Sequence, residues 1–130
     1  MKIRNAKCPA ETTLSVIGGR WKIPILYHLF QGEKRFSELR RLVGRISQKM
    51  LTQQLRELER DGIIHREVYA QVPPRVDYSL TALGESLRPA IDALCAWGMK
   101  FRDGKFDDKA IHSLIAGQAG SNTENVAQHK

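Results

Sequence analysis

Apolar residues recur with helical spacing over the first third of the chain. The stretches "AETTLSVIGG", "RWKIPILYHLFQG" and "RFSELRRLVGRI" each place apolar side chains on one face, and the first two end at glycine. The pattern predicts three short helices. Their expected inward residues are Leu14, Val16, Ile17, Ile25, Leu26, Leu29, Phe30, Phe36, Leu39 and Val43.

The stretch "SQKMLTQQLRELERDG" predicts a fourth helix over residues 47–61. Ser47 is a favourable N-cap, and Gly62 stands where helices often end in a left-handed conformation. At 1.5 Å per residue, a helix of roughly 14 residues is about 21 Å long. Its leucines share one side and are expected to face the core. They are Leu51, Leu55 and Leu58.

Beyond this helix the pattern changes from helical to alternating. Residues 63–69, "IIHREVY", and 75–80, "RVDYSL", alternate or nearly alternate apolar and polar side chains, and the prolines of "AQVPP" cannot continue a central strand. The sequence predicts a hairpin over residues 63–80. It should lie against the helices, because a lone hairpin is only marginally stable.

From Thr81 the spacing becomes helical again and predicts one long helix over residues 81–103 with a continuous apolar stripe. Pro89 lies inside it and is expected to bend it or to break its hydrogen-bond ladder locally. Residues 105–130 are expected to form one more short helix and a polar, disordered tail.

Composition restricts the class of protein. A chain of 130 residues with 42% hydrophobic and 27% charged residues is typical of one soluble globular domain. It has no apolar run of membrane-spanning length and no apolar core of a secretory signal, so we expect a cytoplasmic protein without a membrane partner. No residue spacing predicts a metal site, and no motif predicts a bound cofactor.

The net charge of +7 is concentrated in the first part of the chain. Residues 1–60 carry 13 Lys and Arg against 5 Asp and Glu, whereas residues 61–130 carry 8 against 9. Basic chains attract polyanions, although a solvated surface can be basic without a partner. The charge therefore favours nucleic acid as a partner and locates the attraction in residues 1–60.

The polar side of the helix over residues 47–61 has cationic and amide side chains in its outermost row, with Glu57 and Glu59 expected at the edges. The DNA major groove admits a helix, guanine accepts hydrogen bonds from Arg or Lys, and adenine pairs with Gln. Such residues are also good helix formers, and for an isolated helix this ordinary explanation is preferred. The row and its flanks are Gln48, Lys49, Thr52, Gln53, Arg56 and Arg60.

The order of the predicted elements favours DNA. A short helix, a turn, a second helix and a hairpin form a winged helix-turn-helix, whose second helix enters the major groove. We therefore predict a mainly α fold with a small β-hairpin. Basic residues before the second helix, Arg45 among them, should lie near phosphates, and Arg75 near a minor groove, with Arg66 and His65 less securely there. The predicted DNA-binding residues are Lys34, Arg35, Arg40, Arg41, Ser47, Gln48, Lys49, Thr52, Gln53, Arg56, Arg60 and Arg75.

The motifs over residues 8–98 resemble one family. "CP", "IGGRWKIPIL", "RFSELRR", "ISQKMLTQQLRELERDGII", "VPPRVDYSLTALGESL" and a final "WG" follow in order. Together they resemble the HxlR family of bacterial transcriptional regulators, relatives of the MarR winged-helix group. The resemblance implies an HxlR-type domain over residues 8–104 that acts as a homodimeric repressor or activator. It also implies an inverted-repeat, double-stranded DNA operator, with residues 69–75 at the wing.

The resemblance further implies that the terminal helices form the dimer interface. The apolar stripe of residues 81–103 agrees with this, because a monomer of this size offers it little to pack against. Ordinary core packing is the alternative for the first half of the stripe. The predicted interface residues are Leu87, Ile91, Leu94, Cys95, Trp97, Gly98 and Phe101.

Two cysteines are too few for a disulfide framework. Some HxlR-family members sense oxidants, quinones or aldehydes through a cysteine near the N-terminus, and Cys8 stands at the matching position. Nearby basic residues and the helix start after Pro9 favour a reactive thiolate, and a small thiol buried at the interface is an equal alternative. Cys95 is expected to pack in the interface, so a Cys8–Cys95 bridge between subunits is the weaker hypothesis. A small-molecule effector at the interface is as compatible with these residues as a thiol switch.

Two other classes of function are alternatives. An enzyme needs a nucleophile with a base, a carboxylate pair or a metal cluster; the sequence assembles none, so no enzyme is predicted. A winged helix can also be a protein-interaction or RNA module. The cationic row in residues 47–61 argues against a purely protein partner, and the lack of an aromatic platform argues against single-stranded RNA.

Overall fold

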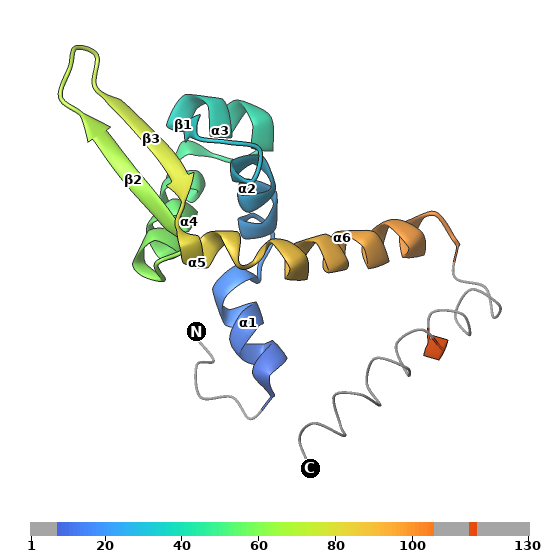
Figure 1. Cartoon of the computed structure of the whole chain (residues 1–130). Coiled ribbons are helices and arrows are strands. Elements are labelled where there is room, and N and C mark those ends of the chain that lie inside the picture. The colour runs from blue at the N-terminus through green and yellow to red at the C-terminus, as the bar shows by residue number, and fades with distance from the viewer. Residues whose placement is uncertain (1–7, 106–114, 117–130) are drawn as a thin grey trace. The chain divides into compact units, whose positions relative to one another are not determined.

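The computed structural model describes residues 8–105 and 115–116 and is mainly helical, with one long hairpin (Figure 1). The chain divides into a unit that ends at Pro89 and a second unit that begins at Ala90. In chain order the elements are α1 (Pro9–Ile17), α2 (Lys22–Leu29), β1 (Lys34–Arg35), α3 (Phe36–Val43), α4 (Gln48–Arg60), β2 (Ile64–Tyr69), β3 (Arg75–Leu80), α5 (Ala82–Glu85) and α6 (Arg88–Arg102).

The core of the first unit is formed mainly by apolar residues of α2, α3, α4 and the hairpin, together with Ile17 of α1 and Ile46 before α4. The predicted inward residues of α2 and α4 are buried, whereas Phe30, Phe36 and Val43 are half-buried. Leu14 is 57% exposed, contrary to prediction, because α1 makes few contacts with other described elements. The buried apolar residues are Ile17, Ile25, Leu26, Leu29, Leu39, Ile46, Leu51, Leu55, Leu58, Ile63, Ile64 and Tyr78.

Helix α4 begins and ends as the sequence predicts. The Ser47 hydroxyl oxygen accepts a hydrogen bond from the backbone N–H of Met50 at 3.0 Å, which satisfies one of the amides that a helix start leaves free. Gly62 follows the helix with a φ of 76°, a conformation that other residues rarely adopt. With its leucines buried and both ends defined, α4 presents its opposite side to solvent.

Three strands form one antiparallel sheet in the order β1, β3, β2. The hairpin pairs Ile64 with Leu80 at its base and Tyr69 with Arg75 near its tip, which confirms the predicted strands to within one residue. Figure 1 shows it projecting away from the helices. The sequence pattern does not predict β1, because its two residues are too few to show alternation.

The single helix predicted over residues 81–103 is wrong, because the chain forms α5 and α6 with a break between them. Pro89 explains the break, as anticipated: it lacks an N–H, and its ring clashes with the carbonyl four residues back, that of Glu85, the last residue of α5. Helix α5 has its own start, where the Thr81 hydroxyl accepts from the N–H of Gly84 at 3.0 Å.

Helix α6 is the longest helix within residues 8–105, and its 15 residues fall short of the roughly 20 that a transmembrane helix requires. The short helix and tail predicted after Gly104 lie almost wholly outside the described residues. Residues 115–116 are described there and are helical.

Candidate nucleic-acid interface

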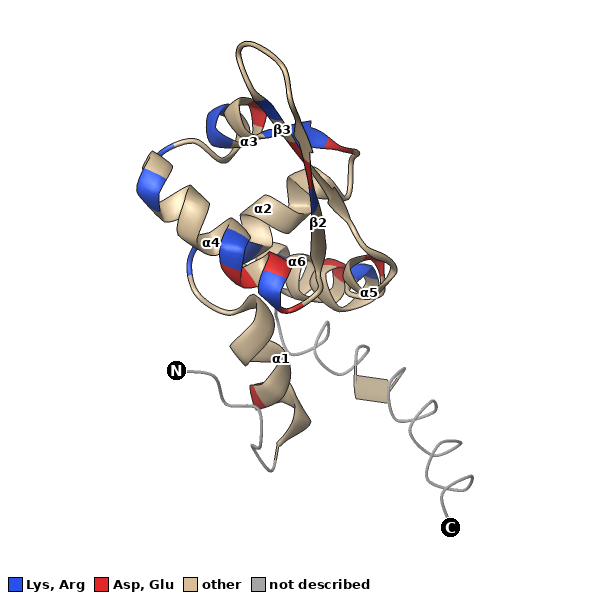
Figure 2. Cartoon of the chain, turned by 90° about the vertical axis from the view of Figure 1, so that its left-hand side faces the viewer, with Lys and Arg blue, Asp and Glu red and all other residues tan. Residues whose placement is uncertain are grey.

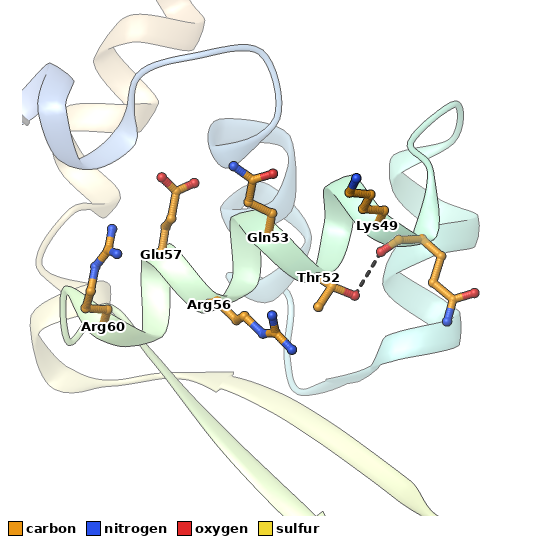
Figure 3. Close-up of a pocket in the computed structure, with 7 residues that line it drawn as sticks. Lys49, Thr52, Gln53, Arg56, Glu57 and Arg60 are labelled. Atoms are coloured by element: carbon orange, nitrogen blue, oxygen red, sulfur yellow. Dashed lines mark hydrogen bonds between the residues drawn. The ribbon is translucent and has the colours of Figure 1, made fainter. Parts of the chain in front are cut away.

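One polar surface covers the exposed side of α4, and we name it the α4 surface. Figure 3 shows Lys49, Gln53 and Glu57 projecting to one side of the helix and Thr52 and Arg56 to the other. The two rows border one solvent-exposed surface, which includes the side chains that the sequence pattern groups on the polar side of the helix. The lining residues are Gln48, Lys49, Thr52, Gln53, Arg56, Glu57 and Arg60.

Glu57 corrects the predicted charge of this surface. The pattern predicts an outer row without acid, whereas the structure includes Glu57 among the lining residues. Its carboxylate lies 3.5 Å from Nζ of Lys22, a residue of α2 that is only 6% exposed. This ammonium offsets the charge of the carboxylate, so the α4 surface keeps the positive balance of Lys49, Arg56 and Arg60.

Two predicted DNA-binding hydroxyls also take part in the hydrogen bonds of α4 itself. The oxygen of Ser47 caps the helix, and the hydroxyl of Thr52 donates to the carbonyl of Gln48 at 2.8 Å. Ser47 keeps its O–H as a donor, and Thr52 keeps its lone pairs as acceptors. Ser47 can therefore still donate to DNA, whereas Thr52 can only accept from it.

The basic residues predicted near phosphates lie on β1 and α3. Figure 2 shows blue segments on α3 and along α4. Arg40 and Arg41 are exposed near the end of α3 and line a depression that reaches Gln48 at the start of α4. Lys34 and Arg35 form β1, directly before α3. The depression joins α3 to the α4 surface, because Gln48 lines both.

Arg75 is held more firmly than the sequence pattern indicates. Its guanidinium donates to both carboxylate oxygens of Asp77, with Nη2–Oδ2 at 2.7 Å and Nε–Oδ1 at 3.0 Å, and its Cζ lies 5.1 Å from the ring centre of Tyr69. These hydrogen bonds hold the pKa of Asp77 below its ordinary value of 3.8. Strand alternation puts residues two apart on one face, so the spacing of Arg75 and Asp77 in the sequence is a signal for this pair.

A second pocket lies between α4 and the hairpin, and we name it the α4–wing pocket. Burial raises the pKa of Tyr78 in it. The Nε of Arg66 donates to the carboxylate of Glu59 at 3.3 Å. His65 lies on the other face of β2, where its ring pairs with Glu67 at 2.9 Å. The lining residues are Thr52, Leu55, Arg56, Glu59, Arg66 and Tyr78.

Both cysteines are free and exposed. Cys8 is the N-cap residue of α1, directly before Pro9, so its predicted place at a helix start is confirmed. Its basic neighbours in the sequence lie outside the described residues. Cys8 belongs to the first unit and Cys95 to the second, and a bridge between subunits stays a prediction.

Most of the predicted dimer-interface residues on α6 are exposed in the single chain. Leu94, Trp97 and Phe101 are 49%, 55% and 66% exposed. The rings of Trp97 and Phe101 stack with their centroids 5.2 Å apart. Ile91, by contrast, is 1% exposed and has little surface left for a partner, and Leu87, before α6, is half-buried.

Comparison with known proteins agrees with this geometry. The profile of the HxlR-like helix-turn-helix family matches residues 16–106. The chain belongs to the HxlR-like helix-turn-helix family. It is 62% identical over 96 residues to the HTH-type transcriptional regulator YdeP of Bacillus subtilis, a match that covers 74% of this chain and 75% of YdeP.

Two solved structures extend the comparison. The redox regulator HypR in its reduced form has a TM-score of 0.71 and 56% identity, with 74% of this chain and 95% of HypR covered. The reduced transcriptional regulator YodB of B. subtilis has a TM-score of 0.64 and 38% identity, with 74% and 95% covered. These matches confirm the predicted family and the winged helix-turn-helix fold. The HxlR-like protein is a helix-turn-helix transcriptional regulator, and its family implies DNA binding.

Proposed function

We propose that this HxlR-like regulator binds double-stranded DNA as a homodimer at an inverted-repeat operator, with α4 in the major groove and the hairpin beside a minor groove. The α4 surface carries the proposal: cationic and amide side chains share the exposed face of a helix whose other face is buried. This role places the protein with the chromosome in the cytoplasm.

The α4 surface suits the major groove in size and chemistry. A helix of 13 residues is about 20 Å long and, with side chains, about 10–12 Å across, and the groove is about 12 Å wide. Gln53 and Arg56 can form the two-bond pairs with adenine and guanine that distinguish these bases. Arg40 and Arg41, on the helix that would cross the backbone, can bind flanking phosphates.

The exposed apolar side chains of α6 support the homodimer. Leu94, Trp97 and Phe101 are large apolar groups that a second chain would remove from water. Gly98 lies among them in sequence. A Cβ added to it would meet no atom of the described residues within 4 Å, which leaves room for close approach. Two-fold symmetry would set two copies of α4 on half-sites about 34 Å apart, one turn of DNA.

We further propose that oxidation of Cys8 switches DNA binding. The exposed thiol at the start of α1 supports this, because an oxidant in solution can reach it. The related HypR is a redox regulator with solved oxidised and reduced forms. Diamide would take two electrons and two protons from two thiols as they join in a disulfide, and dithiothreitol would reverse this.

The test measures the affinity for a duplex that flanks the protein's own gene, by fluorescence anisotropy. A scrambled duplex of equal length is the comparison. Binding is measured at about 50 and about 200 mM salt, where contact with 6–10 phosphates predicts a loss of roughly 10³-fold or more. Each titration is repeated after diamide and again after dithiothreitol, with wild type, Cys8→Ser and Cys95→Ser.

We expect wild type to bind selectively and with strong dependence on salt. Diamide should abolish this binding and dithiothreitol should restore it, whereas diamide should leave the binding of Cys8→Ser unchanged. Selective binding that oxidation never alters would remove the thiol switch and point to a ligand as the signal. Equal affinity for both duplexes would contradict operator recognition and favour an interaction module.

A further inference from the structure

The α4–wing pocket contains a hydroxyl group that has no hydrogen-bond partner in the part of the chain that the structure describes. The Tyr78 side chain is 92% buried, at 8% exposure, and lines the pocket together with residues of α4. Its hydroxyl has no hydrogen-bond partner within residues 8–105. In the same part of the chain, Nδ1 of His28 is the single fully buried side-chain atom without a partner, so the Tyr78 hydroxyl must reach solvent. A buried ring thus presents one O–H donor to the pocket.

Arg66 supplies a cation beside this hydroxyl. Arg66 and Tyr78 are direct partners in the β2–β3 register, so their side chains share the face of the hairpin that lines the pocket. Glu59 engages Nε of Arg66 at 3.3 Å and orients the guanidinium. The two terminal amino groups of Arg66 have no partner within the described residues, so they can donate to a ligand.

The charge of the pocket suits a single anion. Arg56 and Arg66 contribute two positive charges and Glu59 contributes one negative charge, which leaves a balance of +1. One phosphodiester carries a charge of −1 and accepts hydrogen bonds through its free oxygens. The Tyr78 hydroxyl is a donor at neutral pH, because the ordinary pKa of tyrosine is 10.0 and burial raises the pKa of Tyr78 further.

The position of the pocket identifies the source of that anion. A sugar-phosphate backbone separates each major groove from the neighbouring minor groove. A protein with α4 in one groove and the hairpin at the other must straddle that backbone, and the α4–wing pocket lies between these two elements. Along the hairpin face that lines the pocket, the apolar pair of Ile64 and Leu80 lies at the base. The polar pair of Arg66 and Tyr78 lies farther out.

We propose that the α4–wing pocket binds one phosphate of the DNA backbone in each half-site, with the Tyr78 hydroxyl and the terminal amino groups of Arg66 as donors. The inference rests on the proposed DNA binding and adds to it a site that fixes the hairpin against α4. It assigns Tyr78 and Arg66 to backbone contact, and contact of this kind is independent of base sequence.

The test compares Tyr78→Phe, Arg66→Gln and the control Tyr27→Phe, which removes the same hydroxyl from an exposed tyrosine of α2. Affinity is measured for the gene-flanking duplex and its scrambled form. Tyr78→Phe should lose roughly tenfold on both at an unchanged salt slope, since a hydrogen bond to a charged group is worth about one factor of ten or more. Arg66→Gln should lower that slope by about 1 per half-site. Tyr27→Phe should match wild type.

A single neutral methylphosphonate moved along the backbone locates the contact. At one position in each half-site it should weaken wild type more than Tyr78→Phe, because the variant has only the Arg66 contact left to lose there. A melting temperature for Tyr78→Phe close to wild type excludes misfolding as the cause; if it falls, Arg66→Gln, changed at a side chain 48% exposed, carries the same test.

Three results would overturn the inference. If Tyr78→Phe binds both duplexes as tightly as Tyr27→Phe does, the pocket holds no phosphate although the regulator still binds DNA. If no methylphosphonate position distinguishes wild type from Tyr78→Phe, and inorganic phosphate at fixed ionic strength competes with DNA only in wild type, the pocket takes a free anion instead. If wild type binds neither duplex, this inference and the proposed function fall together.

Discussion

Thr81 joins the end of α4, the end of β3 and the start of α5 through one hydroxyl group. The oxygen accepts from the N–H of Gly84 at 3.0 Å. The O–H can donate to the carbonyl oxygens of Gly62 and Ile63, which lie 2.6 and 3.0 Å from Oγ1. Thr81→Val keeps the shape of the side chain and removes both roles. The change therefore tests how strongly α4 is tied to the elements that follow it.

The magnitude follows from these contacts. Loss of an N-cap oxygen costs about 0.5–2 kcal/mol, and loss of a long-range hydrogen bond about 0.5–1.5 kcal/mol. Gly62 is exposed, so water can hydrogen-bond to its carbonyl in the variant. The combined loss of the two interactions should therefore lie near the middle of the range that these values give. We expect Thr81→Val to lower the free energy of unfolding by about 1–3 kcal/mol, and the melting temperature by roughly 4–20 °C.

The assay is thermal and urea unfolding followed by circular dichroism, at one protein concentration for all variants because the proposed dimer makes stability concentration-dependent. Thr81→Ser is the matched control, since it keeps the hydroxyl and loses only a methyl group. It should remain within about 1 kcal/mol of wild type. Equal stabilities of Thr81→Val and Thr81→Ser would refute the reasoning, because the hydroxyl would then contribute nothing.

Four more predictions concern DNA, stability in acid and the dimer. Arg56→Ala should cost roughly 1–3 kcal/mol at one operator position, whereas Arg40→Ala should weaken all sequences alike; equal losses for both on operator and scrambled DNA in anisotropy would contradict these roles. Asp77→Asn should release Arg75 and reduce the preference for operator over scrambled DNA. An unchanged ratio of the two affinities would show that the Arg75–Asp77 pair does not contribute to DNA recognition. The pKa of Asp77 is lowered on folding, so its contribution to stability is present above pH of about 4 and is lost as the pH falls through the lower folded pKa; acid should therefore destabilise wild type more than Asp77→Asn. Gly98→Leu should shift the protein toward monomer in light scattering, and a dimer of unchanged affinity would remove Gly98 from the interface.

Patterns of neighbouring residues in the sequence predicted α4 and the hairpin. The leucines of α4 repeat at helical spacing, and Ser47 and Gly62 supply the side-chain oxygen and the left-handed conformation that bound the helix. The hairpin follows from alternation interrupted by two prolines. The family resemblance added the dimer and the operator, which no periodicity in this chain reveals.

The features of the site that the sequence does not predict depend on contacts between residues far apart in the chain. Helical geometry gives the direction in which Glu57 leaves α4, but its partner Lys22 comes from α2, and a lysine is rarely expected in a core. Tyr78 fits a strand pattern as an ordinary core residue, and its solvent-facing hydroxyl becomes evident only when α4 packs beside the hairpin. In both cases tertiary packing, rather than local sequence, determines the chemistry of the site.

The pairing of Lys22 with Glu57 has a consequence for how this regulator can diverge. Lys22 lies on α2, outside the helix that is proposed to read DNA, yet its ammonium offsets the charge of the Glu57 carboxylate on the α4 surface. A single change at position 22 could therefore alter operator preference while every residue of α4 stays the same. Two gene copies with identical recognition helices could acquire different targets through a buried side chain that never touches a base.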